Sequence, residues 1–375
     1  MGKKVISGSL MAAVFLIGSV IPAAAGVSIV NKDLGGQKLK VKLFGFSQIT
    51  AQSGNGLASS ATDKRDGLRF GADRVRLGYK LSMNKVFSKL QIDFVKSDGT
   101  HKQGQLSNVI KDADVGYKFN KTFSVKVGEF KTPVGMDFNT SGAKLDITKR
   151  GMEKALVLER SLGAMLSGRK IGGIFGYDIG IFNPATRASK VVDNASSNKI
   201  YGVAGHDYAY AVRGMADWQS LHAELSYGVS EEAAGDSYAV GTADKDYSVW
   251  DVAASYKLDV MTLKGEYIAG SNIKGVNNSD ESVWYLHAGY RFLPMLEGVI
   301  RHYQAHYSPV TGVSTDLGNT YLGLNIFLNP KVKHAARIQL NYVIASGDDG
   351  FGGTYGGITK GYMNNVILAQ FQLAF

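Results

Sequence analysis

The chain has 375 residues, 45% of them hydrophobic and 20% charged, with 46 glycines, 19 tyrosines and no cysteine. This composition excludes an intrinsically disordered chain and a disulfide-linked scaffold, because apolar surface is plentiful and thiols are absent. The net charge of +10 indicates an anionic partner without choosing among nucleic acid, lipid headgroups and small anions. Abundant glycine and tyrosine beside only six prolines favour a large β architecture.

The first 25 residues have the pattern of a secretory signal peptide. Lys3 and Lys4 precede an uncharged, mostly apolar run from Val5 to Ile21, and small residues end at Ala25. The run is short for a membrane anchor, and no basic flank follows it directly. We therefore expect a signal peptide over residues 1–25 and a mature chain from residue 26. Removing two lysines would leave 40 basic and 32 acidic residues, a net charge of +8.

Period-2 alternation of polar and apolar residues fills the rest of the chain. It is clear in residues 89–94, 123–128, 221–227 and 337–344. A strand with one polar and one apolar face gives this pattern. About sixteen such segments start near Lys40, Leu68, Ser88, Asn108, Phe123, Leu162, Gly172, Ile200, Leu221, Tyr247, Val260, Ser282, Glu297, Asn319, Ala336 and Met363.

The connections between these segments alternate between short and long. Short ones include residues 84–85, 120–122, 218–220 and 258–259; long ones include 52–66, 97–107, 131–161, 183–198, 230–246, 270–281 and 346–361. Five prolines all fall in connections, as an unbroken ladder requires. The last segment alternates and ends on Phe375. Together these features predict an all-β, transmembrane antiparallel β-barrel of about 16 strands, with short periplasmic turns and longer external loops. Residues 26–375 would form this multi-pass barrel in the outer membrane of a Gram-negative bacterium, in contact with its lipid.

Strand phase predicts which charges face the lumen. If apolar positions face lipid, Arg74, Arg76 and Lys80 face inward on the second strand. The same phase puts ten basic and seven acidic side chains inside, leaving the first and thirteenth strands unassigned. Ten aromatic residues at or near strand ends are candidates for the membrane-interface girdle: Tyr79, Tyr117, Phe119, Tyr177, Phe182, Tyr227, Tyr256, Tyr290, Phe292 and Phe327.

The longest connection, residues 131–161, is the expected constriction loop. It carries six basic residues, Arg150 among them, against four acidic ones. A narrow passage lined by net positive charge attracts anions and repels cations. Pairing of these charges with one another, merely to hold the loop in place, is the alternative for each residue.

From Asp63 to Asn183, and again in the closing strand, the chain resembles the phosphate-selective porin O and P family. The resemblance lies in residues 70–79, 112–117, 127–135, 160–161, 169–172 and 180–183. It implies a sixteen-stranded trimeric porin whose lumen guides anions such as phosphate to a basic constriction. Matched to the family by position, four residues are expected to contact the anion: Arg74, Arg76, Lys126 and Lys131. Two more candidates come from the sequence itself, Lys80 from the strand phase and Arg150 from the charge of the long loop. Asp73 stands where the family resemblance leads us to expect another arginine.

Other functions remain open at this stage. A general, cation-selective or sugar-selective porin would share the fold. An outer-membrane barrel enzyme would need a nucleophilic or metal site, and neither a G-x-S-x-G elbow nor an H-E-x-x-H motif occurs. A structural barrel with a blocked lumen is a third class. We expect no enzyme activity, no cofactor, no metal site and no nucleic-acid partner.

Overall fold

The computed structural model describes residues 26–54, 67–96, 109–184, 208–231, 246–273, 276–348, 359 and 361–375. The expected signal peptide and parts of several long connections lie outside these residues. The strands are β1 (Val27–Leu34), β2 (Gln37–Ser53), β3 (Arg69–Met83), β4 (Val86–Asp93), β5 (Ile110–Lys118), β6 (Ser124–Lys131), β7 (Arg160–Ile171), β8 (Phe175–Phe182), β9 (Ala209–Trp218), β10 (Leu221–Ser230), β11 (Tyr247–Lys257), β12 (Met261–Ser271), β13 (Asp280–Leu293), β14 (Leu296–Ser308), β15 (Thr315–Phe327), β16 (Ala336–Gly347) and β17 (Val366–Ala374).

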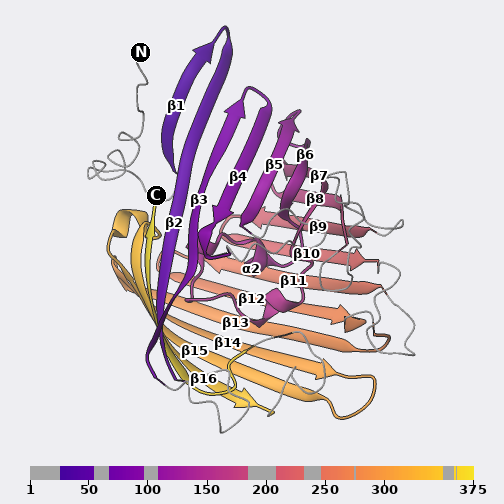
Figure 1. Ribbon diagram of the computed structural model, residues 1–375, viewed down its shortest axis with the longest axis vertical. Helices are drawn as coiled ribbons and strands as arrows, with labels where there is room; N and C mark the ends of the chain where they lie inside the picture. The colour runs from indigo at the N-terminus through magenta and orange to yellow at the C-terminus, as the bar shows by residue number, and fades with distance from the viewer. Residues whose placement is uncertain are drawn as a thin grey trace, which may run out of the picture.

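Strands β2 to β17 form a closed antiparallel barrel (Figure 1). Each strand pairs with its neighbour in sequence, and β17 pairs with β2 from Ile367 opposite Ser53 to Ala374 opposite Phe46. Closure leaves the barrel wall without a free strand edge. The predicted all-β barrel of about sixteen strands is therefore confirmed. Among the described residues, no helix has the length and apolar character to cross a membrane.

The strand boundaries follow the expected alternation of short turns and long connections. The strand expected from Ile200 begins at Ala209, and residues 201–207 lie outside the described part. A strand not expected from the sequence, β1, pairs with the first half of β2. Its sequence does not alternate regularly, because Val30 directly follows Ile29 and three polar residues follow Val30.

The outer surface is apolar, as the alternation predicts. Exposed outward side chains include Leu77, Val127, Val252, Ile367 and Phe371. The aromatic prediction was wrong for Phe182 and Phe327, which are 1% and 2% exposed and face inward. Phe182 packs edge-on against Phe130, with ring centroids 5.7 Å apart.

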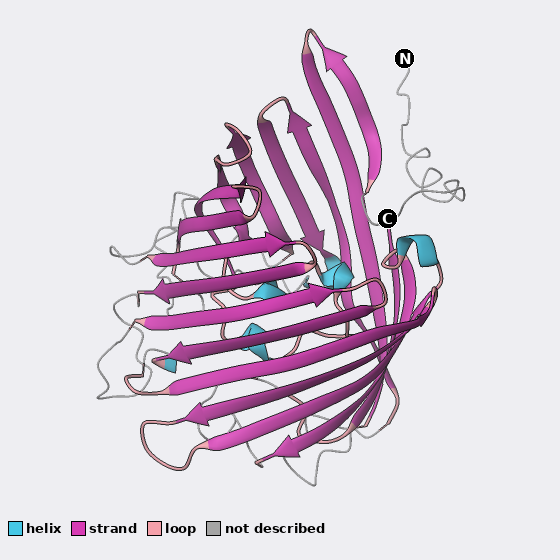
Figure 2. Cartoon of the chain, turned by 180° about the vertical axis from the view of Figure 1, so that it is seen from behind, coloured by secondary structure: helices cyan, strands magenta, loops and turns pink. Residues whose placement is uncertain are grey.

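The long loop between β6 and β7 folds into the barrel. It contains the short helix α2 (Met136–Asn139) and the 3-10 turns η2 (Gly142–Lys144) and η3 (Met152–Ala155). These helices lie inside the ring of strands, not above it (Figure 2). Apolar loop residues such as Phe138, Leu156 and Val157 are buried against inward-facing tyrosines of β13 and β14. The lumen is therefore filled on one side, and the loop determines where a passage remains.

Candidate functional site

Ion pairs hold the long loop against the wall formed by β12–β14. Asp146 of the loop accepts from Arg301 at 3.0 Å and from Lys264. Asp137 of α2 lies 3.4 Å from Arg301 and 3.6 Å from Arg150. Arg301 is only 1% exposed, so its charge depends on these two carboxylates for compensation.

Amide side chains of the adjoining strands bind the loop backbone. Gln339 and Asn325 both donate to the Asp146 carbonyl at 3.1 Å, and Gln370 donates to the Thr148 carbonyl at 3.0 Å. Gln372 and Gln48 donate in the same way to Ala143 and Gly142. Because the loop has little regular structure, its carbonyl groups need such partners when they are buried. These amides of β15–β17 and β2 therefore bind the loop backbone.

Carboxyl groups of the loop and of β12 form an acidic cluster. Glu153 is fully buried, and both of its carboxyl oxygens lack a hydrogen-bond partner among the described residues. Burial, together with the nearby carboxyls of Asp137 and Glu266, raises the pKa of Glu153 well above its ordinary value. Burial also acts to raise the pKa of Asp137, but Arg301 and Arg150 hold it below its ordinary value.

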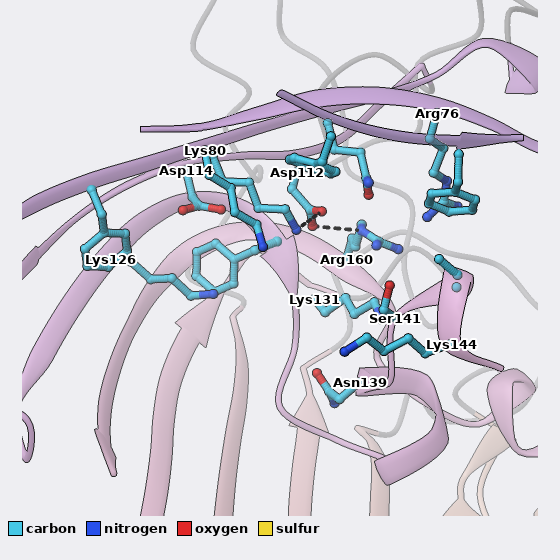
Figure 3. Close-up of a pocket in the computed structure, with 18 of the residues that line it drawn as sticks. Arg76, Lys80, Asp112, Asp114, Lys126, Lys131, Asn139, Ser141, Lys144 and Arg160 are labelled. Carbon is cyan, nitrogen blue, oxygen red and sulfur yellow. Dashed lines mark hydrogen bonds and ion pairs between the residues drawn. The ribbon is translucent and has the colours of Figure 1, made fainter. Parts of the chain in front are cut away.

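The opposite wall, β3–β7, stays open and borders a cavity of about 600 Å³. Nine lysine and arginine side chains line this cavity, against only two aspartates. Figure 3 shows the arrangement: Lys80, Lys126 and Asp112 project from the wall, and Asn139, Ser141 and Lys144 face them from the loop. The passage is thus bounded by strand lysines on one side and by loop residues 139–144 on the other.

Some of the basic side chains on this wall are neutralised by a carboxylate. Asp93 accepts from Arg76 at 2.9 Å. Asp112 bridges two bases, with Lys89 Nζ at 2.6 Å and Arg160 Nε at 3.2 Å. These ion pairs fix the positions of the charged groups, but the opposite charges largely cancel, so the pairs add little to the positive potential of the cavity.

Four lysines that line the cavity make no ion pair with a described residue: Lys80, Lys126, Lys131 and Lys144. The ammonium of Lys126 lies 3.7 Å from the ring centroid of Phe130, and that of Lys80 lies 5.3 Å from that of Phe44. Aromatic faces position these cations without neutralising them. The four lysines therefore supply the uncompensated positive charge of the cavity.

The six candidate residues from the sequence separate into two groups. Arg76, Lys80, Lys126 and Lys131 all line the cavity. The Lys131 ammonium also donates to the loop carbonyls of Phe138 and, at 2.9 Å, Thr140, so it holds the loop as well.

The other two candidates do not line the cavity. Arg74 donates to Gln48 at 2.6 Å beside the loop. Arg150, with a side chain 8% exposed, donates to the carbonyls of Asp137 and, at 2.6 Å, Thr140. Both pack with the loop: Arg74 through Gln48, which donates to the Gly142 carbonyl, and Arg150 through carbonyls within the loop itself. The spacing of residues along the sequence does not indicate that Arg74 and Arg150 pack with the loop.

A second cavity of about 800 Å³ lies beside β9–β16, and its charge is mixed. Seven basic and five acidic residues line it, including Lys257, Lys264, Glu224 and Glu297. Asn139, Ser141 and Lys144 belong to both cavities, so the two adjoin at the loop. Among the described residues no cluster of three histidine or acidic side chains is arranged to hold a metal ion.

Sequence reasoning missed two features of the passage. The first strand could not be phased, yet Phe44 and Phe46 face the lumen and support the cations. The bridging role of Asp112 was also missed, because its partners Lys89 and Arg160 are far apart in sequence. Only the phase of β5, which points Asp112 inward, could have suggested it.

Comparison with known proteins agrees with this architecture. Solved structures similar to the chain include OmpF of Salmonella typhi in complex with daunomycin (15% identity, TM-score 0.64, 93% of this chain and 100% of that chain). They also include an anion-selective porin from Comamonas acidovorans (14% identity, TM-score 0.59, 90% of this chain and 100% of that chain). A third is a loop L8 deletion mutant of OmpT, an outer membrane protein of Vibrio cholerae (14% identity, TM-score 0.61, 90% of this chain and 99% of that chain). At these identities the likeness concerns the fold alone.

Comparison with curated protein sequences gives no match. The sequence profile of the family described as phosphate-selective porin O and P matches residues 50–349, which is most of the chain. Together with the closed barrel, this match identifies the chain as a multi-pass outer-membrane porin of the phosphate-selective porin O and P family.

Proposed function

We propose that this porin favours small oxyanions, phosphate among them, and that the selectivity resides in the open β3–β7 wall. The observation that carries the proposal is the lining of the first cavity, with nine basic residues against two acidic ones. Lys80, Lys126, Lys131 and Lys144 are the proposed contacts, with Arg160 and Arg76 beside them. The loop fills the other side of the lumen, so a solute must pass close to these lysines.

The mechanism is electrostatic and needs no covalent step. An anion entering from the long-loop side meets the net positive potential of a narrow passage with low-dielectric walls. Lys80, Lys126 and Lys144 then exchange water for phosphate oxygens through charge-assisted hydrogen bonds. Because Arg76, Lys89 and Arg160 already have carboxylate partners, the anion is held weakly enough to leave again.

We also propose that the chain works as a passive channel and not as an enzyme, and as a homotrimer. The porin family assignment supports the channel, and the trimer is the state that the family resemblance implies.

Current through the refolded protein in a planar bilayer tests the proposal. In a KCl gradient the zero-current potential is expected to have the sign of chloride preference, and added phosphate is expected to reduce the chloride current. A potential with the sign of potassium preference would contradict anion selectivity and leave only the porin fold. Chloride preference without any effect of phosphate would restrict the proposal to simple anions.

A further inference from the structure

One face of the β1–β2 hairpin is apolar and turns away from the lumen. Lys42 of β2 lies opposite Lys80 of β3, which faces the first cavity. Because side chains alternate along a strand, Leu39, Val41 and Leu43 lie on the other face of β2. These three side chains therefore belong to the outer surface of the barrel wall.

The neighbouring strands extend this apolar surface on both sides of β2. Val41 lies opposite Val30 of β1 and opposite Leu81 of β3. Together the three strands form an apolar patch, which consists of Val27, Val30, Leu39, Val41, Leu43, Leu81 and Met83. Lys32, opposite Leu39, is the charged residue on this face, at its far end. The patch is therefore a sheet face without a covering layer among the described residues.

Part of the patch lies outside the membrane. Two outward aromatic residues flank it: Tyr79 lies opposite Leu43, and Phe375 exchanges backbone hydrogen bonds of 3.1 and 3.0 Å with Gly45. Such rings mark the membrane–water boundary of a barrel, and the short turns mark its periplasmic side. Residues 37–42 continue beyond both rings, and the hairpin extends past the neighbouring turns (Figures 1 and 2). This end of the patch therefore projects into the periplasm, where lipid does not cover it.

Within the membrane, the outer face of β2–β4 differs from that of the wall across the barrel. Strands β9, β10, β11 and β13 carry exposed outward aromatic residues: Tyr210, Tyr227, Trp250, Tyr256 and Tyr290. On β2 and β4 no aromatic side chain faces outward, and β3 has Phe70 and Tyr79.

The outward positions of β2 that continue the patch into the membrane are mostly small. They hold Gly45, Ser47 and Ala51, beside the exposed Ile49. Aromatic side chains anchor a wall to the lipid boundary, whereas small ones let another chain approach closely. The membrane part and the periplasmic part of this face are therefore both suited to contact with protein.

We propose that the outer face of β1–β4 is the contact between copies of this chain, and that the β1–β2 hairpin extends the contact into the periplasm. The inference rests on the homotrimer proposed above and assigns the face that forms it. Lipid would cover only the membrane part of the face, and a periplasmic protein only the projecting part. A second copy covers both, because it presents the same apolar surface at the same depth. Burial of the patch between copies removes it from water and stabilises the trimer.

Light scattering of the refolded full chain in detergent tests the periplasmic part of the contact. The wild type is expected to have the mass of a trimer. The variant L39Q/V41Q is expected to raise the dissociation constant of the trimer at least about ten-fold, because it puts polar groups on the patch. The matched control K38Q/K40Q changes the lumen side of the same hairpin and is expected to leave the trimer unchanged.

A second pair of variants tests the membrane part. S47W/A51W places bulky rings on the proposed contact and is expected to dissociate the trimer. A223W/A254W places the same rings on β10 and β11, where Ala223 and Ala254 lie opposite each other on the outer wall, and is expected to remain trimeric. Resistance of each barrel to unfolding in detergent at room temperature shows that the variant is folded.

The outcomes separate the contact from the homotrimer itself. A monomeric wild type would overturn both. A trimeric wild type that S47W/A51W leaves intact, or that A223W/A254W dissociates at least as strongly, would overturn the β1–β4 face and leave the homotrimer standing. Dissociation by S47W/A51W without any effect of L39Q/V41Q, or with an equal effect of K38Q/K40Q, would show that the hairpin takes no part in the contact.

Discussion

The two sides of the lumen use their charges differently. On β10–β17 and β2, charged and amide side chains are directed at the loop, and Arg301, Asp137 and Asp146 neutralise one another inside the protein. On β3–β7 the loop leaves the wall open, and Lys80 and Lys126 face the cavity without a carboxylate partner. In the proposed function, selectivity therefore depends on which charges stay unpaired and not on how many the barrel contains.

The largest expected effect comes from breaking the buried anchor with Arg301→Met. Asp137 and Asp146 would lose a buried partner, which costs about 3–5 kcal/mol. We expect the loop to leave its wall, giving a lower unfolding temperature and a noisier, larger single-channel conductance. The control Arg291→Met removes an arginine whose head group, among the described residues, bonds only to the Asp259 carbonyl at the rim. Equal conductance in both variants would show that Arg301 does not anchor the loop.

The next effect concerns the bridging carboxylate of the open wall. Asp112→Asn would release Lys89 and Arg160 from their ion pairs. We expect phosphate to bind about ten-fold more tightly, equivalent to about 1.4 kcal/mol, and to leave more slowly. The measurement is the phosphate concentration that halves the chloride current. Asp114→Asn changes the net charge equally without breaking a described ion pair. The same shift in both variants would mean that net charge alone decides affinity.

A smaller effect is expected from pH through Glu153. Its pKa is raised by burial, so between its ordinary value of about 4.3 and the raised value the folded chain holds a proton that the unfolded chain has lost. Stability should therefore fall as the pH rises through this range. Glu153→Gln should flatten this dependence when unfolding temperatures in detergent at pH 5 and pH 8 are compared. An unchanged slope in the variant would assign the dependence to other groups.

The smallest effect is expected on the mixed side of the lumen. Lys257→Gln removes one of seven bases from a cavity that also has five acids. We expect the zero-current potential to change by a small fraction of the change caused by Lys80→Gln. A larger change at Lys257 would place the selective passage in the second cavity.

The barrel could be predicted from the sequence because alternation and turn spacing are local. Each strand shows its two faces within eight to ten residues, and the inward phase of Arg76, Lys80 and Lys126 followed from this. The loop could not be predicted in the same way. Its position depends on side chains far away in sequence, such as Gln339 and Gln370, that bind its carbonyls. For this reason Arg74 and Arg150 had the expected charge, but they lie in loop packing.

The most direct test compares charge reversal on the two sides of the lumen. The zero-current potential in a KCl gradient would be measured for K80E/K126E on the open wall and for K257E/K333E in the mixed cavity. Each variant changes the net charge by the same amount. We expect K80E/K126E to abolish or reverse the chloride preference and K257E/K333E to retain most of it. Equal shifts in the two variants, or a larger one in K257E/K333E, would contradict the claim that the unpaired lysines of β3–β7 set the selectivity.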